Sequence, residues 1–268
     1  MKNIFFLSGL PRSGNTLLSA ILNQNPEVFV SPSSPLFDNL SVINSMLQTN
    51  EPNKVIDYEL QTTTALQEFT KGFYQHIDKP IIIDRNKAWG DKRSMYLAYK
   101  YVTDKPKVIY MVRDVTEILA SFIKLVGSDE NTFMDRGIAE WNLQPYGEQT
   151  INDLRCEWLM RNQVGACLVT LTELLNLNIP VCLIEYNHLV RNPEQEINKV
   201  YEFLELPRYK HDFNNITKLE NEDLLNANLP DNLHNVLTQV QDTGTNSNSL
   251  LSNSTLQKYS GLEFWRKR

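Results

Sequence analysis

Gly9-Leu10-Pro11-Arg12-Ser13-Gly14-Asn15-Thr16 lies between a short apolar run, Ile4–Ser8, and a helical pattern of leucines and isoleucines over Asn15–Asn23. The apolar run predicts a buried strand that ends at the first glycine, and the recurring apolar residues predict a helix with one buried face. The two glycines and the threonine nearly match the phosphate-binding loop G-x-x-x-x-G-K-[ST], which joins a strand to a helix. This stretch therefore predicts an α/β fold with an anion-binding loop near its N-terminus.

The loop has the chemistry that an anion requires. Glycines let the backbone curl so that several N–H groups point inward, and the N-terminus of the following helix adds partial positive charge. Arg12 supplies a cation, and Ser13 and Thr16 supply hydroxyl groups. Nucleoside-triphosphate loops carry lysine where this chain has Asn15, so the cation lies three residues earlier here. The alternative is a helix-capping turn with an incidental arginine.

Apolar runs and helical patterns alternate along the rest of the chain. We expect strands at Ile81–Asp84, Lys107–Val112 and Pro180–Glu185, and helices at Leu36–Leu47, Tyr58–Ile77, Asp91–Tyr101, Val115–Leu125, Asn152–Leu175 and Pro193–Leu204. Continuous apolar strands that alternate with helices are typical of a parallel sheet covered on both faces. The predicted fold is α/β, a P-loop-like three-layer arrangement with a central, mostly parallel sheet flanked by helices, and we expect a single domain over residues 1–268.

Composition restricts the classes of partner. The net charge is −6, whereas proteins that coat nucleic acid are usually basic, so we expect no nucleic-acid partner. None of the three cysteines forms a C-x-x-C pair, and we expect buried, reduced thiols. No apolar run approaches the ~18 residues of a membrane span, and the N-terminal run is too short for a signal peptide, so we expect a cytoplasmic protein. Polar residues dominate from about residue 226 to 255, which predicts a long loop.

A second candidate anion site follows the strand predicted at Lys107–Val112. Arg113 and Asp114 come directly after that strand, and Ser121 comes eight residues after Arg113, inside the next predicted helix. Arginine can bind a phosphate through two parallel hydrogen bonds. Ser121 lies about two turns into the helix, at roughly 3.6 residues per turn. Taken alone, Arg-Asp after a strand is more often an ion pair at a helix start.

Both motifs resemble those of the sulfotransferases. Pro11–Thr16 resembles the family's 5′-phosphosulfate loop, commonly Pro-(Lys/Arg)-Ser-Gly-Thr-Thr, with Asn15 in place of the commoner Thr or Ser. The strand followed by Arg113 and then Ser121 resembles the family's 3′-phosphate motif, and the bacterial group related to tyrosylprotein sulfotransferases is the most similar in pattern. The resemblance implies 3′-phosphoadenosine 5′-phosphosulfate (PAPS) as sulfuryl donor, PAP as its desulfated product, and no metal. The implied donor-binding residues are Pro11, Arg12, Ser13, Gly14, Asn15, Thr16, Arg113 and Ser121.

Two weaker similarities lie further along the chain. The segment Ile184-Glu185-Tyr186-Asn187-His188-Leu189 resembles the family's strand-Tyr-Glu-Asp-Leu segment, in which the tyrosine flanks the adenine. Tyr186 is therefore a candidate donor-binding residue, and a core tyrosine is an equal alternative. Leu256–Trp265 resembles the family's last helix, and we expect it to dock back onto the fold.

The resemblance also implies two catalytic cations. Arg12 would neutralise the leaving 5′-phosphate. Lys87, just past the strand at Ile81–Asp84, resembles a family lysine that contacts the transferred sulfuryl group. A solvated surface lysine is the alternative for Lys87.

The base that an acceptor hydroxyl requires is harder to place. The family's glutamate falls on Pro32 or Ser33 here, and no histidine lies where the family has one. Asp84 is the best substitute by position, because ligands bind at the carboxyl ends of strands in such sheets. Asp38 is the second candidate.

The sequence thus predicts an enzyme, a PAPS-dependent sulfotransferase that modifies a hydroxyl or amine by metal-free in-line displacement. Two alternatives remain open: a P-loop nucleotide kinase or NTPase, and a catalytically inactive protein that binds PAP or PAPS. Small molecules, lipids, sugars and peptides all fit as acceptors, and the oligomeric state is not readable. Segments expected on the acceptor side are Ser31–Pro35, Tyr58–His76 and Thr132–Tyr146, with Trp89, Phe133 and Trp141 as an aromatic patch.

Overall fold

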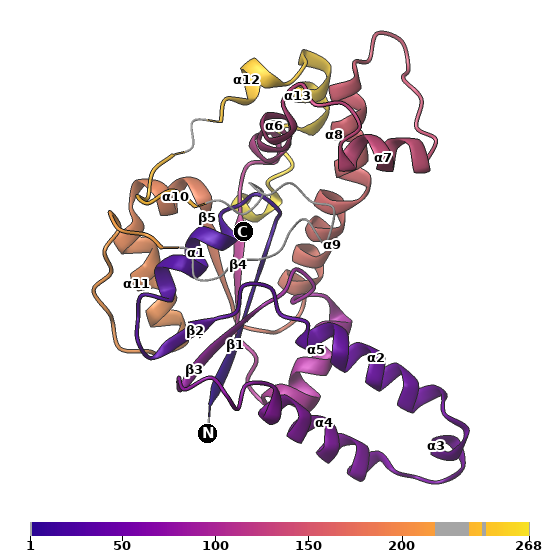
Figure 1. The fold of residues 1–268 in the computed structure, drawn as a ribbon, viewed down its shortest axis with the longest axis vertical. Coiled ribbons are helices and arrows are strands. Elements are labelled where there is room, and N and C mark those ends of the chain that lie inside the picture. The colour runs from indigo at the N-terminus through magenta and orange to yellow at the C-terminus, as the bar shows by residue number, and fades with distance from the viewer. Residues whose placement is uncertain (1, 218–235, 243–244, 268) are drawn as a thin grey trace.

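A parallel sheet forms the centre of the protein. The structure is a computed structural model that describes residues 2–217, 236–242 and 245–267. Five strands lie in the order β2-β3-β1-β4-β5, and every neighbouring pair runs parallel. They are β1 (Asn3–Gly9), β2 (Val28–Val30), β3 (Ile81–Arg85), β4 (Val108–Val112) and β5 (Val181–Glu185). The predicted α/β class is confirmed, and β1 lies mid-sheet with the glycine loop at its carboxyl end (Figure 1).

Helices cover both faces of the sheet (Figure 1). One face carries α1 (Asn15–Leu22), α10 (Tyr186–Arg191) and α11 (Pro193–Leu204), and the other carries α6 (Val115–Val126), α8 (Ile151–Arg161) and α9 (Gln163–Asn176). The alternation of side chains along a strand sets these two layers. Phe6 packs in the cluster with α6, α8 and α9, whereas the next residue, Leu7, packs with α1 and α11.

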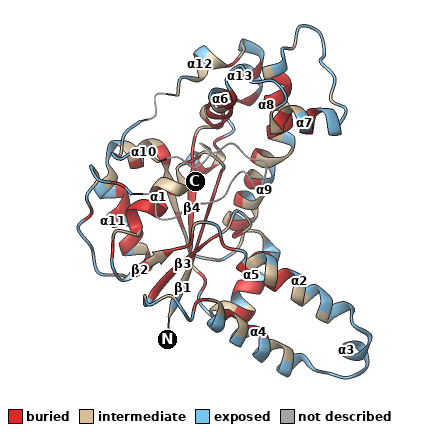
Figure 2. Ribbon diagram, viewed as in Figure 1, coloured by how far each residue is buried: buried red, intermediate tan, exposed pale blue. Residues whose placement is uncertain are grey.

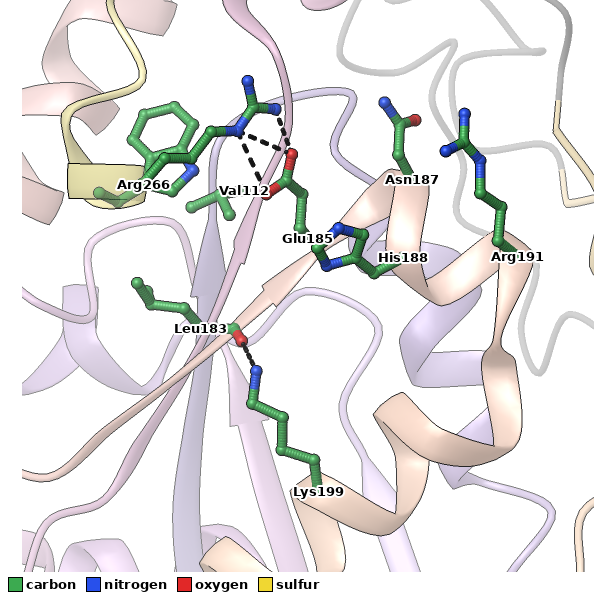
Figure 3. A pocket seen from close by; sticks show the side chains of 9 residues that line it. Val112, Leu183, Glu185, Asn187, His188, Arg191, Lys199 and Arg266 are labelled. Carbon is green, nitrogen blue, oxygen red and sulfur yellow. Dashed lines mark hydrogen bonds and ion pairs between the residues drawn. The ribbon is translucent and has the colours of Figure 1, made fainter. Parts of the chain in front are cut away.

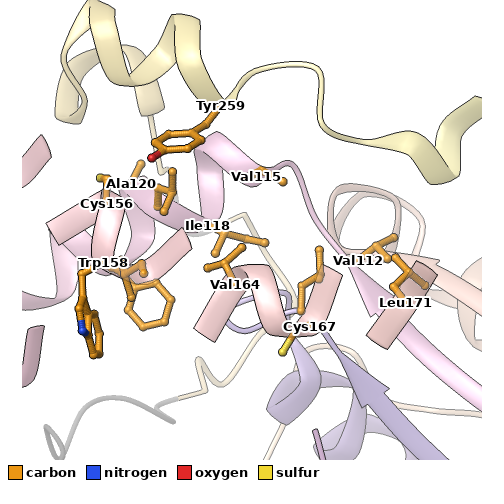
Figure 4. Close-up of a cluster of buried hydrophobic side chains, with 14 of the residues drawn as sticks. Val112, Val115, Ile118, Ala120, Cys156, Trp158, Val164, Cys167, Leu171 and Tyr259 are labelled. Atoms are coloured by element: carbon orange, nitrogen blue, oxygen red, sulfur yellow. The ribbon is translucent and has the colours of Figure 1, made fainter. Parts of the chain in front are cut away.

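The larger core cluster lies between β4 and the helices α6, α8 and α9 (Figure 4). Tyr110, in the middle of β4, is fully buried, and its hydroxyl donates to Cys167 O of α9 (2.8 Å). Since all five residues of β4 are buried, on both faces of the sheet, its sequence is an unbroken apolar run. Figure 2 shows buried residues through the sheet and the inner helix faces.

A helical arm extends from the β2–β3 side of the sheet (Figure 1). It contains α2 (Leu36–Thr49), α3 (Glu51–Val55), α4 (Glu59–Phe73) and α5 (Lys92–Leu97), and α5 continues as a π-helical stretch over Ala98–Val102. Leu36, Leu40 and Leu66 form a third core cluster with Ile82 of β3, which anchors the arm to the sheet. The far end of the arm is exposed (Figure 2).

One predicted helix differs from the structure, and some elements were not predicted. The helix expected over Asn152–Leu175 is broken at Asn162, whose φ of −111° and ψ of −87° lie outside helical values, so α8 and α9 are separate. β2 was not predicted, because three residues give too short an apolar run to separate from a loop. A further helix, α7 (Phe133–Glu140), lies in the stretch expected on the acceptor side.

The C-terminal segment docks as expected. It contains α12 (Ser247–Leu250), α13 (Asn253–Tyr259) and a 3₁₀ turn over Phe264–Lys267, and Tyr259 and Trp265 are buried beside α6. The predicted polar loop at 226–255 is described only in part, since residues 226–235 and 243–244 lie outside the described residues. In the described part of the chain, no helix combines the length and apolarity needed to cross a bilayer.

The two outer strands of the sheet differ in length. β2 at one edge has three residues, and β5 at the other has five. On β5, the Lys199 ammonium from α11 donates to Leu183 O (2.7 Å), and Figure 3 shows this contact along the outer edge of the strand.

Candidate active site

The loop between β1 and α1 is held in shape by its own polar side chains. Leu10 N–H donates to Met111 O of β4 (2.9 Å), which ties the loop to the neighbouring strand. Ser13 Oγ, fully buried, and Asn15 Nδ2 both donate to Leu10 O, at 2.5 Å and 3.0 Å. These two side chains were predicted to bind the ligand, but here they bond the loop itself. Contact of Ser13 and Asn15 with a ligand stays a prediction.

Gly14 ends the loop in a conformation that glycine favours. Its φ is +89°, in the left-handed region, and it is the N-cap of α1. A Cβ on Gly14 would lie 2.7 Å from Cδ2 of Tyr186, the first residue of α10. The loop and the ring can pack this closely only because position 14 has no side chain.

Arg12 joins the two predicted motifs. Its Nε donates to Ser121 Oγ in α6 (3.2 Å), so residues 109 positions apart in the sequence meet in the fold. Arg12 also has a left-handed backbone, with φ of 58°. Its carbonyl oxygen accepts from Arg113 Nη1 (3.1 Å). The glycine loop and the strand-Arg…Ser motif thus form one continuous site.

Arg113 is buried and held from three directions, with only 3% of it exposed. Its Nε donates to Glu117 Oε2 (3.0 Å), and its guanidinium lies 4.2 Å from the centre of the Tyr186 ring. The contact with the Arg12 carbonyl is the third. Asp114 caps α6 by accepting from Thr116 N–H and Glu117 N–H. Asp114 therefore has the role of a helix-start residue, while Arg113 supplies positive charge to the site.

The site is electrostatically prepared for an anion. Burial lowers the pKa of Arg12, and the neighbouring Arg113 guanidinium lowers it further. Two positive groups that share a poorly solvated place repel each other, and a bound anion would offset both the repulsion and the lost hydration. The geometry therefore favours a ligand with negative charge between the arginines.

Tyr186 is a packing residue in this structure. It is 4% exposed, its face lies under the Arg113 guanidinium, and its edge lies against Gly14. This placement is closer to the core alternative than to an open stacking platform. Contact of Tyr186 with adenine stays a prediction.

Arg85 is a cation of the site that reasoning from the sequence missed. It is the last residue of β3, it is 9% exposed, and its Nη1 donates to Thr16 Oγ1 (3.3 Å) at the start of α1. The signal that could have found it is its position directly after Asp84, at the carboxyl end of a strand that pairs with β1.

Lys87, which was predicted as a catalytic cation, lies two residues after the end of β3. It is exposed, its main-chain carbonyl accepts from Ser8 Oγ (3.1 Å), and its ammonium makes no hydrogen bond to any residue that the structure describes. Burial raises the pKa of the Cys167 thiol of α9 to about 11, and the positive charge of Lys87 opposes that rise.

Asp84, predicted as the base, is enclosed. It is fully buried and accepts hydrogen bonds from Ser34 Oγ (2.6 Å), Trp89 Nε1 (2.6 Å) and the Tyr74 hydroxyl. Burial raises the pKa of this carboxyl. An acceptor cannot reach a carboxylate whose oxygens are already surrounded by donors, so we correct its role to that of a structural hub.

Asp38 lies in the first turn of α2 and is exposed. Its Oδ2 accepts from Asn86 Nδ2 (3.1 Å), and the same amide donates to Ser34 O (2.7 Å). Asn86 follows Arg85 directly, so Asp38 lies on the carboxyl side of the sheet near the glycine loop.

Comparison with known proteins agrees with this geometry. A family model described as "Sulfotransferase family" matches residues 5–211. The chain belongs to the sulfotransferase family. It is 22% identical over 218 residues to "Protein-tyrosine sulfotransferase A" of Caenorhabditis elegans, an alignment that covers 75% of this chain and 50% of that protein. The chain therefore spans about half the length of that curated relative.

Two solved structures of sulfotransferase domains share the fold. The sulfotransferase domain from the Synechococcus PCC 7002 olefin synthase superposes with a TM-score of 0.53 at 17% identity, covering 99% of this chain and 96% of that one. The sulfotransferase domain from the curacin biosynthetic pathway has a TM-score of 0.50 at 16% identity, covering 98% and 87%. At these identities the likeness is one of fold.

The three aromatic residues that we predicted as a patch on the acceptor side differ in their exposure. Trp89 is fully buried and bonded to Asp84, so it belongs to the core. Phe133 is partly buried against the larger core cluster, and Trp141 is 44% exposed. Trp141 alone of the three is available to an acceptor.

A cavity of about 540 Å³ lies at the outer edge of β5 (Figure 3). The Arg266 guanidinium crosses it to Glu185, and His188 and Arg191 of α10 lie on the other side. Within the described residues, no three His, Cys, Asp or Glu side chains gather as a metal-binding group.

Proposed function

We propose that this protein transfers a sulfuryl group from PAPS to a hydroxyl or amine acceptor, by in-line displacement without a metal. The contact between Arg12 and Ser121 carries the proposal, because it puts the glycine loop and the second anion motif in one site. A donor with phosphate groups at two ends fits two adjacent anion motifs. A single terminal phosphate would use only one of them.

Each motif has a separate task in this proposal. The loop backbone and Arg12 hold the 5′-phosphosulfate end, with Thr16 and Arg85 beside it. Arg113 and Ser121 hold the 3′-phosphate, and Glu117 and Tyr186 keep the Arg113 guanidinium in place. Sulfuryl transfer, like phosphoryl transfer, depends on positioning and on charge stabilisation at the bridging oxygen. Arg12 supplies that stabilisation.

The kinase alternative makes a different binding prediction. In nucleoside-triphosphate loops a lysine at position 15 reaches the phosphates, whereas the Asn15 amide is bonded to Leu10 O and Ser13 Oγ within the loop. We expect isothermal calorimetry to show PAP binding in the presence of EDTA, and ATP or GTP binding at least about 10-fold weaker, equal to about 1.4 kcal/mol. Tight ATP binding that needs Mg²⁺, with none for PAP, would contradict the proposal.

Arg85 and Lys87 can be separated by matched substitutions. We propose that Arg85, which contacts Thr16, stabilises the transferring group, so Arg85→Ala should lower kcat by about 10²-fold, as loss of one oxyanion donor does. Lys87→Ala, the substitution predicted from the resemblance to be damaging, should change kcat by less than about 3-fold (about 0.7 kcal/mol). Steady-state transfer from PAPS to a phenol measures both. The reverse ranking would restore Lys87 to the role.

The third alternative, a catalytically inactive protein that binds PAP or PAPS, is tested by looking for a sulfated product. Mass spectrometry after incubation with PAPS and a panel of phenols, peptides, lipids and sugars should reveal an acceptor about 80 Da heavier, the mass that one covalently attached sulfuryl group adds. If PAP binds and every acceptor stays unmodified, the protein is a binding protein and the proposed transfer is wrong.

A further inference from the structure

The acidic residues at the carboxyl ends of β3, β4 and β5 are engaged on all sides or by a helix start or an ion pair. Asp84 in β3 is enclosed by donors, and Asp114 after β4 caps α6. Glu185 at the end of β5 is paired with Arg266. Asp38, which approaches the same edge of the sheet from α2, is exposed.

Asp38 is placed by a short chain of contacts that begins at the donor loop. Thr16 of the loop accepts from Arg85, and Asn86, the next residue, donates its backbone N–H to Leu7 O of β1 (3.1 Å). The Asn86 side-chain amide then donates to Asp38 Oδ2 (3.1 Å). Ser34 N–H donates to Arg85 O (2.8 Å), which fixes the β2–α2 loop to the same strand end. Arg85 and Asn86, consecutive residues at the end of β3, therefore connect the Thr16 hydroxyl to the Asp38 carboxylate.

The carboxylate is also oriented. Asn86 occupies Oδ2 only, and Oδ1 makes no hydrogen bond to any residue that the structure describes. The amide that holds Oδ2 is itself fixed by its second bond to Ser34 O (2.7 Å). One oxygen is thus anchored, and the other is available to a hydroxyl group that approaches from solvent.

We propose that Asp38 is the base that takes the acceptor's proton, and that Asn86 is its positioning residue. This role rests on the proposed sulfuryl transfer. The acceptor oxygen forms a bond to sulfur as the bond between sulfur and the bridging oxygen breaks. The electron pair of that bond goes to the departing phosphate, and the hydroxyl proton goes to Asp38 Oδ1. The products are a sulfate ester, a phosphate and a protonated Asp38, which returns its proton to water.

The test uses acceptors of graded acidity, because a base matters less when the acceptor ionises unaided. Transfer from PAPS is measured at pH 8 with phenols that range from 4-methylphenol to 4-nitrophenol, for wild type and Asp38→Asn. We expect Asp38→Asn to lower kcat about 10²-fold or more with 4-methylphenol, within the range for general-base catalysis, and less than about 5-fold with 4-nitrophenol. PAP affinity, measured by calorimetry, should stay unchanged in the variant.

Asp78→Asn is the matched control, since Asp78 is an exposed carboxylate at the opposite end of β3. It should leave kcat unchanged with every phenol. Asn86→Ala should lower kcat more with 4-methylphenol than with 4-nitrophenol, the same order of losses as in Asp38→Asn.

The outcomes separate the two proposals. An equal loss with all phenols in Asp38→Asn, or no loss, would show that Asp38 is not the base while transfer itself stands. If wild type binds PAP and sulfates no phenol or other acceptor, the proposed function fails and the role of Asp38 fails with it.

Discussion

Gly14 is a position at which the loop tolerates little change. Its positive φ disfavours a side chain, and the Tyr186 ring, which would lie 2.7 Å from a Cβ at this position, leaves no room for one. Gly14→Ala should lower PAP affinity at least about 10-fold (about 1.4 kcal/mol), because either the loop or the Tyr186–Arg113 pair must shift. Calorimetry with PAP measures the loss.

Gly147→Ala is the control for backbone strain alone. Gly147 also has a positive φ (62°), and a Cβ there would meet nothing within 4 Å. It should cost about 1 kcal/mol in stability, typical of a left-handed non-glycine residue, and leave PAP affinity unchanged. Equal effects of the two substitutions on affinity would contradict the importance of the ring contact.

At the scale of residues, the sequence predicted parts of the site that have a fixed motif spacing. The two motifs could be predicted because each has a fixed pattern next to a strand, and the fold brings Arg12 to Ser121. Arg85 and Asp84 could not be ranked, because adjacent residues at a strand end point to opposite sides. Only the structure shows that the carboxylate of Asp84 points into the core and that the guanidinium of Arg85 reaches Thr16.

At the scale of elements, the C-terminal segment fastens the helix that carries Ser121. Glu263 Oε1, buried, accepts from Val115 N–H at the start of α6 (2.9 Å). Thr255 Oγ1 donates to Asp153 Oδ1 (2.7 Å), and Ser252 donates to the same oxygen, which joins α13 to α8. The position of the second anion motif therefore depends on the far end of the chain.

The Asp153 junction predicts a pH dependence of stability. Burial raises the pKa of Asp153, but hydrogen bonds from Ser252, Thr255 and Thr150 outweigh it and bring the pKa down to about 2. A folded-state pKa below the unfolded value of about 3.9 means that the ionised group stabilises the fold above pH ~4, and that this stability is lost as the pH falls toward ~2. Asp153→Asn should therefore lower the free energy of unfolding by about 1 to 2 kcal/mol at pH 7.

Urea unfolding at pH 7 and at pH 3 measures this difference. The gap between wild type and Asp153→Asn should shrink at the lower pH, whereas Asp104→Asn, an exposed carboxylate in a loop, should show no gap at either. A gap that stays constant with pH would mean that the Asp153 charge does not hold the junction.

The sequence did not predict β2, because that strand is too short, or the break between α8 and α9, because it depends on local backbone geometry. β2 exists because Val28–Val30 can pair with Ile81–Ile83 of β3, a long-range contact that no window of three residues reveals. The helix break at Asn162 is equally hidden, because the apolar pattern continues on both sides of it. The four predicted strands, and the predicted helices that became α1, α2, α6 and α11, were placed correctly to within a few residues.

For the whole molecule, the proposed donor site connects both layers of helices through the sheet. The loop leads into α1 on one face, and Arg113 leads into α6 on the other. PAP should therefore stabilise the entire fold by mass action, about 2.7 kcal/mol at 100 times Kd, and raise Tm in a thermal scan. EDTA should leave both Tm and the PAP response unchanged, and a Tm that falls with EDTA would overturn the metal-free proposal.

The contact of Lys199 with Leu183 has a consequence for solubility. A strand at the edge of a sheet exposes backbone groups that can recruit a strand from another molecule, and proteins avoid this with short edge strands and with lysines. Here β2 is three residues long at one edge, and at the other the Lys199 ammonium occupies a carbonyl of β5. Both edges are thus protected against the strand addition that begins aggregation.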